Sequence, residues 1–162
     1  MGFVIQNILH MKKLLLSLAM AVGICGFVMA QEQSKALTLN NTVKADAPAT
    51  EAPVTISVDG TDTGSTATQL RMKSGNKMTV SVSDGYEITK IDFGCSSAGY
   101  QLTADRVTTS PATTTTTVNS TNSTMTLTNP AQSVVITLTA AIRFKSATVY
   151  YPQSVAGGEV PA

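Results

Sequence analysis

Three segments of the chain alternate between apolar residues and mainly hydroxyl-bearing residues. A period of two places the apolar side chains on one face of a β-strand and the polar side chains on the other. A helix would need an apolar repeat of about 3.6 residues instead. These segments are therefore predicted to be strands that each have one buried face. Their apolar positions are Val54, Ile56 and Val58; Met78, Val80 and Val82; and Val134, Ile136, Leu138 and Ala140.

Turn-forming residues separate the alternating segments. Glycine, asparagine and aspartate favour the backbone conformations of tight turns, and proline cannot continue a central strand. Threonine is abundant and helix-favouring runs are absent. Short strands at this spacing predict an all-β fold, an antiparallel β-sandwich. The predicted turns are Asp59-Gly60, Asp62-Thr63-Gly64, Ser74-Gly75-Asn76, Asp84-Gly85 and Asn129-Pro130.

Two further strands shift their apolar phase by one residue. Residues 86–88 and residues 91–93 each alternate, but the phase changes across Thr89-Lys90. The segment 142–151 changes phase in the same way across Lys145-Ser146. One extra residue in a strand is a β-bulge, which returns the apolar side chains to the buried face. The predicted core includes Ile91, Phe93, Ile136, Leu138, Phe144 and Val149.

The segments Ile88-Thr89-Lys90-Ile91 and 142–151, which reads Ile-Arg-Phe-Lys-Ser-Ala-Thr-Val-Tyr-Tyr, carry a resemblance to a known module. Together with the threonine-rich middle, they resemble a β-sandwich module that is common in exported proteins of Bacteroidetes. The resemblance covers roughly residues 54–151. It implies a jelly-roll-like sandwich at the cell surface or in the periplasm, and it assigns no functional residue. The middle segment of this chain contains no Trp, so the resemblance does not supply an aromatic platform for sugars.

The N-terminal segment has the three parts of a secretory signal peptide. Lys12 and Lys13 precede an apolar run that extends to Met29, and Val28-Met29-Ala30 places small residues at the −3 and −1 positions of a cleavage site. We therefore predict cleavage between Ala30 and Gln31. An uncleaved anchor is the alternative, but the apolar run is shorter than the roughly 20 residues of a spanning helix.

A lipoprotein signal and an internal start of translation are the other readings of this segment. Lipidation at Cys25 would require a small residue immediately before it, and the residue there is Ile24. Met11 directly precedes the two lysines and is an alternative start.

The chain divides into four predicted parts. Residues 1–30 are a helical signal peptide, and residues 31–52 are a flexible leader that is rich in small residues and proline. A short strand at residues 36–39 within this leader is an open alternative. Residues 53–152 form the β-sandwich domain, and residues 153–162 form a flexible C-terminal tail.

The residue inventory after position 30 excludes several classes of chemistry. The single histidine, His10, lies in the signal peptide, so a Ser-His-Asp triad and a histidine-ligated zinc are excluded. Removing Lys12 and Lys13 from the eleven basic residues leaves nine against ten acidic residues, a net charge near −1. This balance does not suit nucleic acid, which needs a basic surface. We therefore predict no catalytic residue, no metal and no cofactor.

A few residues are candidates for special roles. Tyr100 and Tyr150 are candidates for ligand binding, because an exposed tyrosine ring can stack on a sugar. The Asp59–Gly64 turn is either a plain turn or a calcium loop. Cys95 has no partner in the mature chain and is expected to be a small buried residue at a strand end. The threonine-rich segment 108–128 is either modified by glycans, an adhesive edge, or a strand flanked by a loop.

Two functions fit these observations. The first is an exported, non-catalytic binding module in the periplasm, on the outer surface or outside the cell, with a glycan or a surface protein as its ligand. The second is a structural or adhesive subunit of a surface assembly. Neither function involves nucleic acid, and the mature form is expected to have no membrane span. The sequence leaves the oligomeric state open.

Overall fold

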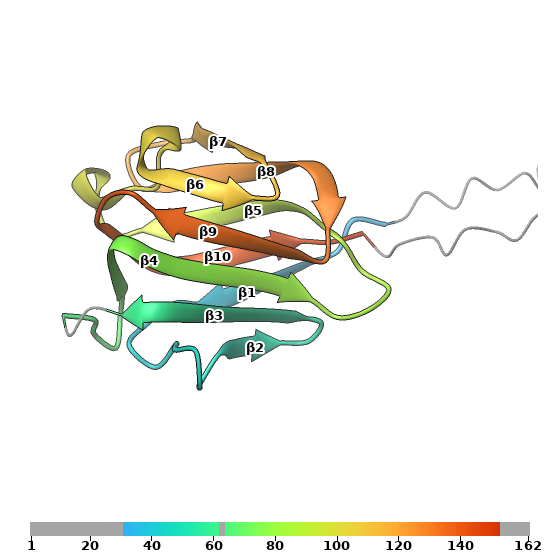
Figure 1. Ribbon diagram of the computed structural model, residues 1–162, viewed down its shortest axis with the longest axis horizontal. Helices are drawn as coiled ribbons and strands as arrows, with labels where there is room; N and C mark the ends of the chain where they lie inside the picture. The colour runs from blue at the N-terminus through green and yellow to red at the C-terminus, as the bar shows by residue number, and fades with distance from the viewer. Residues whose placement is uncertain (1–30, 62–63, 153–162) are drawn as a thin grey trace, which may run out of the picture.

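The computed structural model describes residues 31–61 and 64–152, which form an antiparallel all-β fold (Figure 1). Two short 3-10 turns, η1 (Ala98–Tyr100) and η2 (Ala104–Arg106), connect β5 to β6. The strands are β1 (Ser34–Thr38), β2 (Ala49–Glu51), β3 (Val54–Thr61), β4 (Leu70–Val82), β5 (Ile88–Cys95), β6 (Val107–Ser110), β7 (Thr113–Thr117), β8 (Asn122–Ala131), β9 (Ser133–Leu138) and β10 (Ile142–Tyr150).

The ten strands are connected in one antiparallel sheet that is not closed. Its main path runs β2-β3-β4-β10-β5-β8-β7, so β2 and β7 are the two ends of the path. Three strands lie off this path, because β1 pairs with β10 while β9 pairs with both β4 and β6. The prediction of an all-β, antiparallel fold is confirmed.

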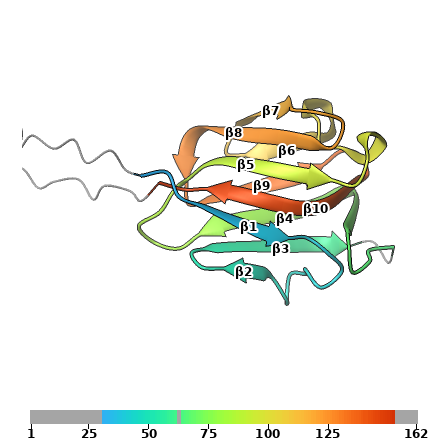
Figure 2. The same cartoon turned by 180° about the vertical axis from the view of Figure 1, so that it is seen from behind.

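Strand β4 changes partner along its length. Its first residues, from Leu70 to Met72, pair with β10, whereas residues Lys77 to Ser81 pair with β9. β3, β4 and β9 consequently lie in front in Figure 1, and β1, β10 and β5 lie in front when the molecule is seen from behind (Figure 2). The sequence predicted a turn at Ser74-Gly75-Asn76, but β4 continues through these residues. Gly75, with a φ of 87°, lies between the two pairings.

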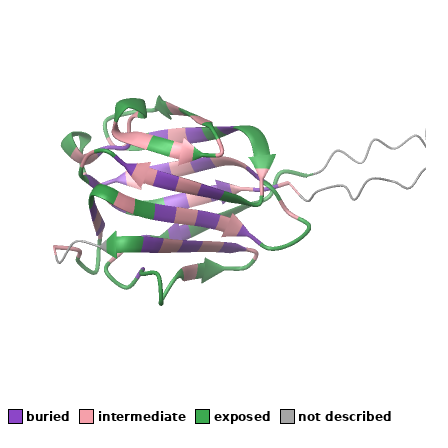
Figure 3. Ribbon diagram, viewed as in Figure 1, coloured by how far each residue is buried: buried purple, intermediate pink, exposed green. Residues whose placement is uncertain are grey.

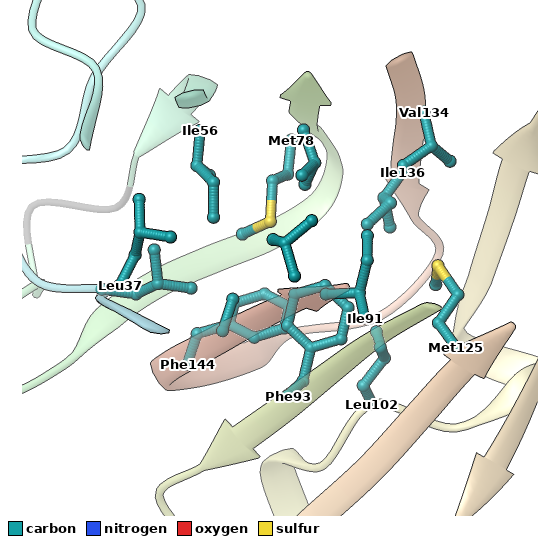
Figure 4. Packing of buried hydrophobic residues seen from close by; sticks show 14 of the residues in the cluster. Leu37, Ile56, Met78, Ile91, Phe93, Leu102, Met125, Val134, Ile136 and Phe144 are labelled. Carbon is teal, nitrogen blue, oxygen red and sulfur yellow. The ribbon is translucent and has the colours of Figure 1, made fainter. Parts of the chain in front are cut away.

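Buried side chains from strands on both sides form one hydrophobic cluster. Burial alternates along most strands, as the striped ribbon in Figure 3 shows. Phe93 of β5 and Phe144 of β10 pack with their ring centroids 5.3 Å apart, and Met78 and Ile136 approach from the opposite side (Figure 4). The predicted core is confirmed, since Ile91, Phe93, Ile136, Leu138, Phe144 and Val149 are all buried.

Both predicted phase shifts occur as irregularities of register. The pairing of β10 with β5 shifts between Phe144 and Ser146, and the pairing of β5 with β8 shifts between Ile88 and Lys90. After the first shift, Ala147 is again buried. The extra residue in β10 therefore keeps the apolar side chains of this strand in the core. At the β5–β8 shift the extra residues lie in β8, because Ile88 pairs with Ala131 while Lys90 pairs with Thr126.

The segment predicted as a flexible leader, residues 31–52, is more ordered than expected. It contains β1, which pairs with β10 from Ser34↔Tyr150 to Thr38↔Ser146, and the short strand β2, which pairs with β3. Leu37, Leu39 and Val43 anchor the segment in the core. Leu37 and Leu39 alternate with Thr38, but two such residues are too short a run to define a strand, and Val43 stands alone. The possible strand at residues 36–39 overlaps β1.

Two predicted terminal parts lie outside the described residues. The predicted signal peptide, residues 1–30, includes Ala30 on one side of the predicted cleavage site. The predicted tail, residues 153–162, is also outside. Gln31 is described and is exposed. Within the described ranges, no helix is long and apolar enough to cross a membrane.

Replacing Phe93 with Ala should lower the free energy of unfolding by about 3–5 kcal/mol, because the ring is fully buried against Phe144. Urea unfolding followed by far-UV circular dichroism measures this change. The matched control is Val118→Ala, which removes an exposed side chain and should change stability by less than about 0.5 kcal/mol. Equal stability of the Phe93→Ala protein and the wild type would show that the strand faces are assigned wrongly.

Candidate functional site

The face of β10, β5 and β8 that points away from the core carries polar side chains in aligned rows. One row places Thr148, Asp92 and Thr124 side by side on the three strands. The adjacent row places Ser146, Gly94 and Asn122 side by side. The two rows bring together residues that are far apart in the sequence, and all six positions lie outside the hydrophobic cluster.

A hollow of about 300 Å³ opens over these two rows. It forms because Gly94 has no side chain: a Cβ atom there would lie 2.6 Å from Ser146 Oγ and 3.7 Å from Asn122 Oδ1. The bulge in β10 places Ser146 opposite Gly94. We call this site the Asp92 hollow; its lining side chains include Asp92, Asn122, Thr124, Ser146, Thr148 and Val118.

Asp92 is the only ionisable residue among those that line the hollow. Its carboxylate accepts a hydrogen bond of 2.6 Å from Thr124 Oγ1. Tyr150 forms a hydrogen bond with Asp92, and this bond is the main reason why the pKa of Tyr150 is raised. Lys90 Nζ in turn lies 3.8 Å from the centroid of the Tyr150 ring. The hydroxyl groups of Thr124 and Tyr150 therefore hold the carboxylate in place, and Lys90 lies against the Tyr150 ring.

Val118 forms an apolar part of the rim. Its side chain is 61% exposed, and no other large hydrophobic residue in the described part of the chain is exposed. The hairpin that carries it is fixed by Asn119 Oδ1, which accepts hydrogen bonds from the backbone N–H groups of Thr121 and Asn122. The buried Gln101 side chain also donates to the backbone carbonyls of Asn119 and Asn122. The rim is therefore attached to the body of the domain.

The structure does not bring the two candidate tyrosines together. The Arg143 guanidinium lies 3.5 Å from the centroid of the Tyr100 ring, and Lys90 covers a face of the Tyr150 ring. Arg143 and Tyr150 stand seven positions apart on β10, a separation of about 20 Å along a strand. Each ring thus has a cation on one face. Tyr150 is not among the residues that line the Asp92 hollow, but it forms a hydrogen bond with Asp92, which does line it.

Sequence reasoning missed Asp92, Asn122 and Ser146. One signal pointed to this place, because the predicted bulge at Lys145-Ser146 marks where β10 changes phase. The sequence gives no register between β10, β5 and β8, so it could not show that Gly94 faces Ser146.

Two other candidates do not form a site in the described residues. Cys95 is the last residue of β5, and burial raises the pKa of its thiol, which keeps it protonated and a poor nucleophile. Its predicted position as a buried residue at a strand end is confirmed. In the part of the chain that is described, no three His, Cys, Asp or Glu side chains are grouped to hold a metal ion. Asp62 and Thr63 of the alternative calcium loop lie outside that part.

No known family model matches this sequence, and no curated protein or solved structure is detectably similar to it.

The Asp92→Asn protein should have a lower pKa for Tyr150, because the substitution removes the carboxylate that raises this pKa, mainly through its hydrogen bond with Tyr150 and also through its charge. Stability that Tyr150 gains from Asp92 is fully present below the ordinary tyrosine pKa of about 10 and is lost as the pH rises through the raised value. This loss should therefore be smaller in the variant. NMR titration of the tyrosine ring carbons measures the pKa directly. Tyr151, whose pKa is raised mainly by burial, is the internal control. An unchanged pKa for Tyr150 would contradict its coupling to Asp92.

Proposed function

We propose that the protein is an exported, non-catalytic binding module with a jelly-roll-like β-sandwich fold, and that it binds a neutral glycan in the Asp92 hollow. The observation that carries the proposal is the composition of the hollow. A carboxylate, an amide and three hydroxyl groups surround a floor formed by Gly94. The sandwich is supported by strands on two sides of the molecule whose buried side chains share one cluster.

The hydrogen-bonding groups of the hollow suit sugar hydroxyls. A hydroxyl both donates and accepts, and the Asn122 amide offers both functions, while the Asp92 carboxylate only accepts. The hydroxyls of Ser146 and Thr148 can rotate to either role, whereas the Thr124 hydroxyl donates to Asp92 and can still accept. The volume lies at the lower end of the roughly 300–1,000 Å³ that small-molecule sites occupy. It therefore suits one or two sugar rings at the end of a chain or along it.

The charge and the rim select among glycans. Asp92 is the only charged residue in the lining. The hydroxyl groups of Thr124 and Tyr150 already occupy part of the hydrogen-bonding capacity of its carboxylate. An anionic sugar would meet this carboxylate without a cation in the lining to balance it. The exposed Val118 side chain offers an apolar surface for the C–H face of a sugar ring. A neutral sugar fits both features.

The proposal of a non-catalytic role follows from the lining residues. Glycoside hydrolysis ordinarily needs two carboxyl groups that flank the scissile bond at about 5–10 Å from each other. The hollow offers one carboxylate, and its partners are hydroxyl groups. Binding without turnover is the function that these groups support.

The proposal of export follows from the sequence of residues 1–30, with cleavage between Ala30 and Gln31. β1 begins only three residues after this position, at Ser34. The mature domain would then act in the periplasm, on the outer surface or outside the cell. The resemblance to the exported Bacteroidetes module supports the same location.

A structural or adhesive subunit is the second candidate function. The observation that favours it is an unpaired edge at β7, which is one end of the sheet path.

Binding of a neutral oligosaccharide by the purified protein should be saturable on a glycan array and by calorimetry. Gly94→Ala should weaken that binding at least tenfold, because the new Cβ enters the hollow beside Ser146 and Asn122. The matched control is Gly99→Ala, where the added Cβ would meet no atom within 4 Å.

The outcomes separate the two parts of the proposal. Glycan binding that Gly94→Ala leaves unchanged would place the ligand on another surface. Binding of only anionic sugars, or of no sugar by the wild type, would reject a neutral glycan as the ligand.

A further inference from the structure

The outer edge of β7 has unpaired backbone groups in a defined pattern. Val118 N–H donates to the Asn122 carbonyl, and Thr128 N–H donates to the Ala112 carbonyl. In an antiparallel ladder, hydrogen-bonded residues alternate with residues whose N–H and C=O groups point to the opposite edge. The even-numbered residues of β7 therefore bond to β8, and Thr113, Thr115 and Thr117 direct their backbone groups away from it. Across the described ranges, no other strand pairs with this edge.

The edge also lacks the charged residues, prolines and bulges that normally prevent strand pairing, although the 3-10 turn η2 lies close to β7. Natural proteins protect exposed edges with charged residues, proline or bulges. β7 consists of five threonines, and no charged residue occurs between Arg106 and Arg143. Its pairing with β8 has no shift of register, and the nearest proline, Pro111, precedes the strand. Thr114, Thr116 and Thr117 are exposed.

We propose that β7 pairs antiparallel with β7 of a second copy of this chain, around a two-fold axis at Thr115. This register brings together the unpaired groups of both edges: Thr115 faces Thr115 of the second copy, and Thr113 faces Thr117 of the second copy. Three facing pairs that each exchange two bonds give roughly six backbone hydrogen bonds. Thr114 faces Thr116 of the second copy in the intervening positions.

A second copy is the occupant that this edge fits best. Every position in the proposed register places threonine opposite threonine, a cross-strand pair that is favourable and carries no charge. An acidic or basic peptide would find no opposite charge along β7. The contact area is small compared with the roughly 1,600 Å² that standard interfaces bury. The dimer should therefore be weak, and its fraction should rise with protein concentration. This inference goes beyond the proposed function, since it concerns an edge of the sheet and not the Asp92 hollow.

Disulfide trapping tests the register. Thr115→Cys places two cysteines at a facing hydrogen-bonded pair, where Cα atoms are about 5.5 Å apart, within the range of about 4.4–6.8 Å for disulfides. Thr117→Cys is the matched control, because position 117 faces position 113 and lies about 13 Å along the strand from its own copy. Both variants keep the same native cysteines, and circular dichroism confirms that each is folded.

Mild oxidation of the purified Thr115→Cys protein should give at least tenfold more cross-linked dimer than Thr117→Cys, measured on non-reducing gels. A mixture of Thr113→Cys and Thr117→Cys proteins should also cross-link. Equal cross-linking of the two single variants, or none in any of them, would overturn the proposal.

Charge pairs provide a second test that needs no cysteine. The variant T114K/T116K places lysines opposite each other across the proposed axis and should be monomeric in sedimentation at a concentration where the wild type dimerises. The variant T114K/T116E places lysine opposite glutamate and should dimerise at least as well as the wild type. If both variants behave alike, the proposed register is wrong.

Discussion

Phe93 and Phe144 pack against each other on the neighbouring strands β5 and β10, and the bulge beside Phe144 keeps this contact in the core. Without the extra residue in β10, the residues after Phe144 would turn their apolar side chains to the solvent face. The bulge allows both Phe144 and Ala147 to be buried, and it leaves Ser146 on the outer face opposite Gly94. The hollow over Gly94 is therefore a consequence of how the core is packed.

The same packing supports the binding site that we propose on the outer face. Strands that bury one face rigidly hold the residues of the other face, so Asp92, Thr124 and Asn122 are fixed before any ligand arrives. Such a preorganised site loses little conformational freedom on binding. The unpaired edge of β7 results from the sheet topology and not from the packing of the core. β7 is the end of the sheet path, and no described strand pairs with its outer side. The proposed binding face and the proposed pairing edge occupy different parts of the domain, so the two proposals are compatible with each other.

The strand faces could be predicted from the sequence, whereas the site could not. Alternation identified Ile91, Phe93 and Phe144 as core residues, and the broken phase located the bulge in β10. The broken phase in β5 coincides with a register shift whose extra residues lie in β8. The prediction of a turn at Ser74-Gly75-Asn76 was wrong, because a glycine with positive φ can also lie within a strand that changes its pairing partner. The order in residues 31–52 was foreseen only as a possible strand at residues 36–39, because Leu37 and Leu39 are too short a run of alternation to define a strand.

Prediction of the candidate site failed for a related reason. The hollow depends on the register among β10, β5 and β8, which are separated in the chain by long stretches that carry no pairing signal. Tyrosines attracted attention as sugar platforms, yet the structure pairs Tyr100 with Arg143 and Tyr150 with Lys90. Asp92 and Asn122 are ordinary polar residues in the sequence, and only their alignment on adjacent strands makes them a site.

The most direct test of the proposed binding face is a titration of the isotopically labelled protein with neutral oligosaccharides, followed by amide chemical shifts in NMR. If the Asp92 hollow binds the sugar, the amide shifts that change with saturation should cluster at Gly94, Asn122 and Ser146 and the residues beside them. Saturable changes confined to another surface, or no changes with any neutral sugar, would contradict the proposed site.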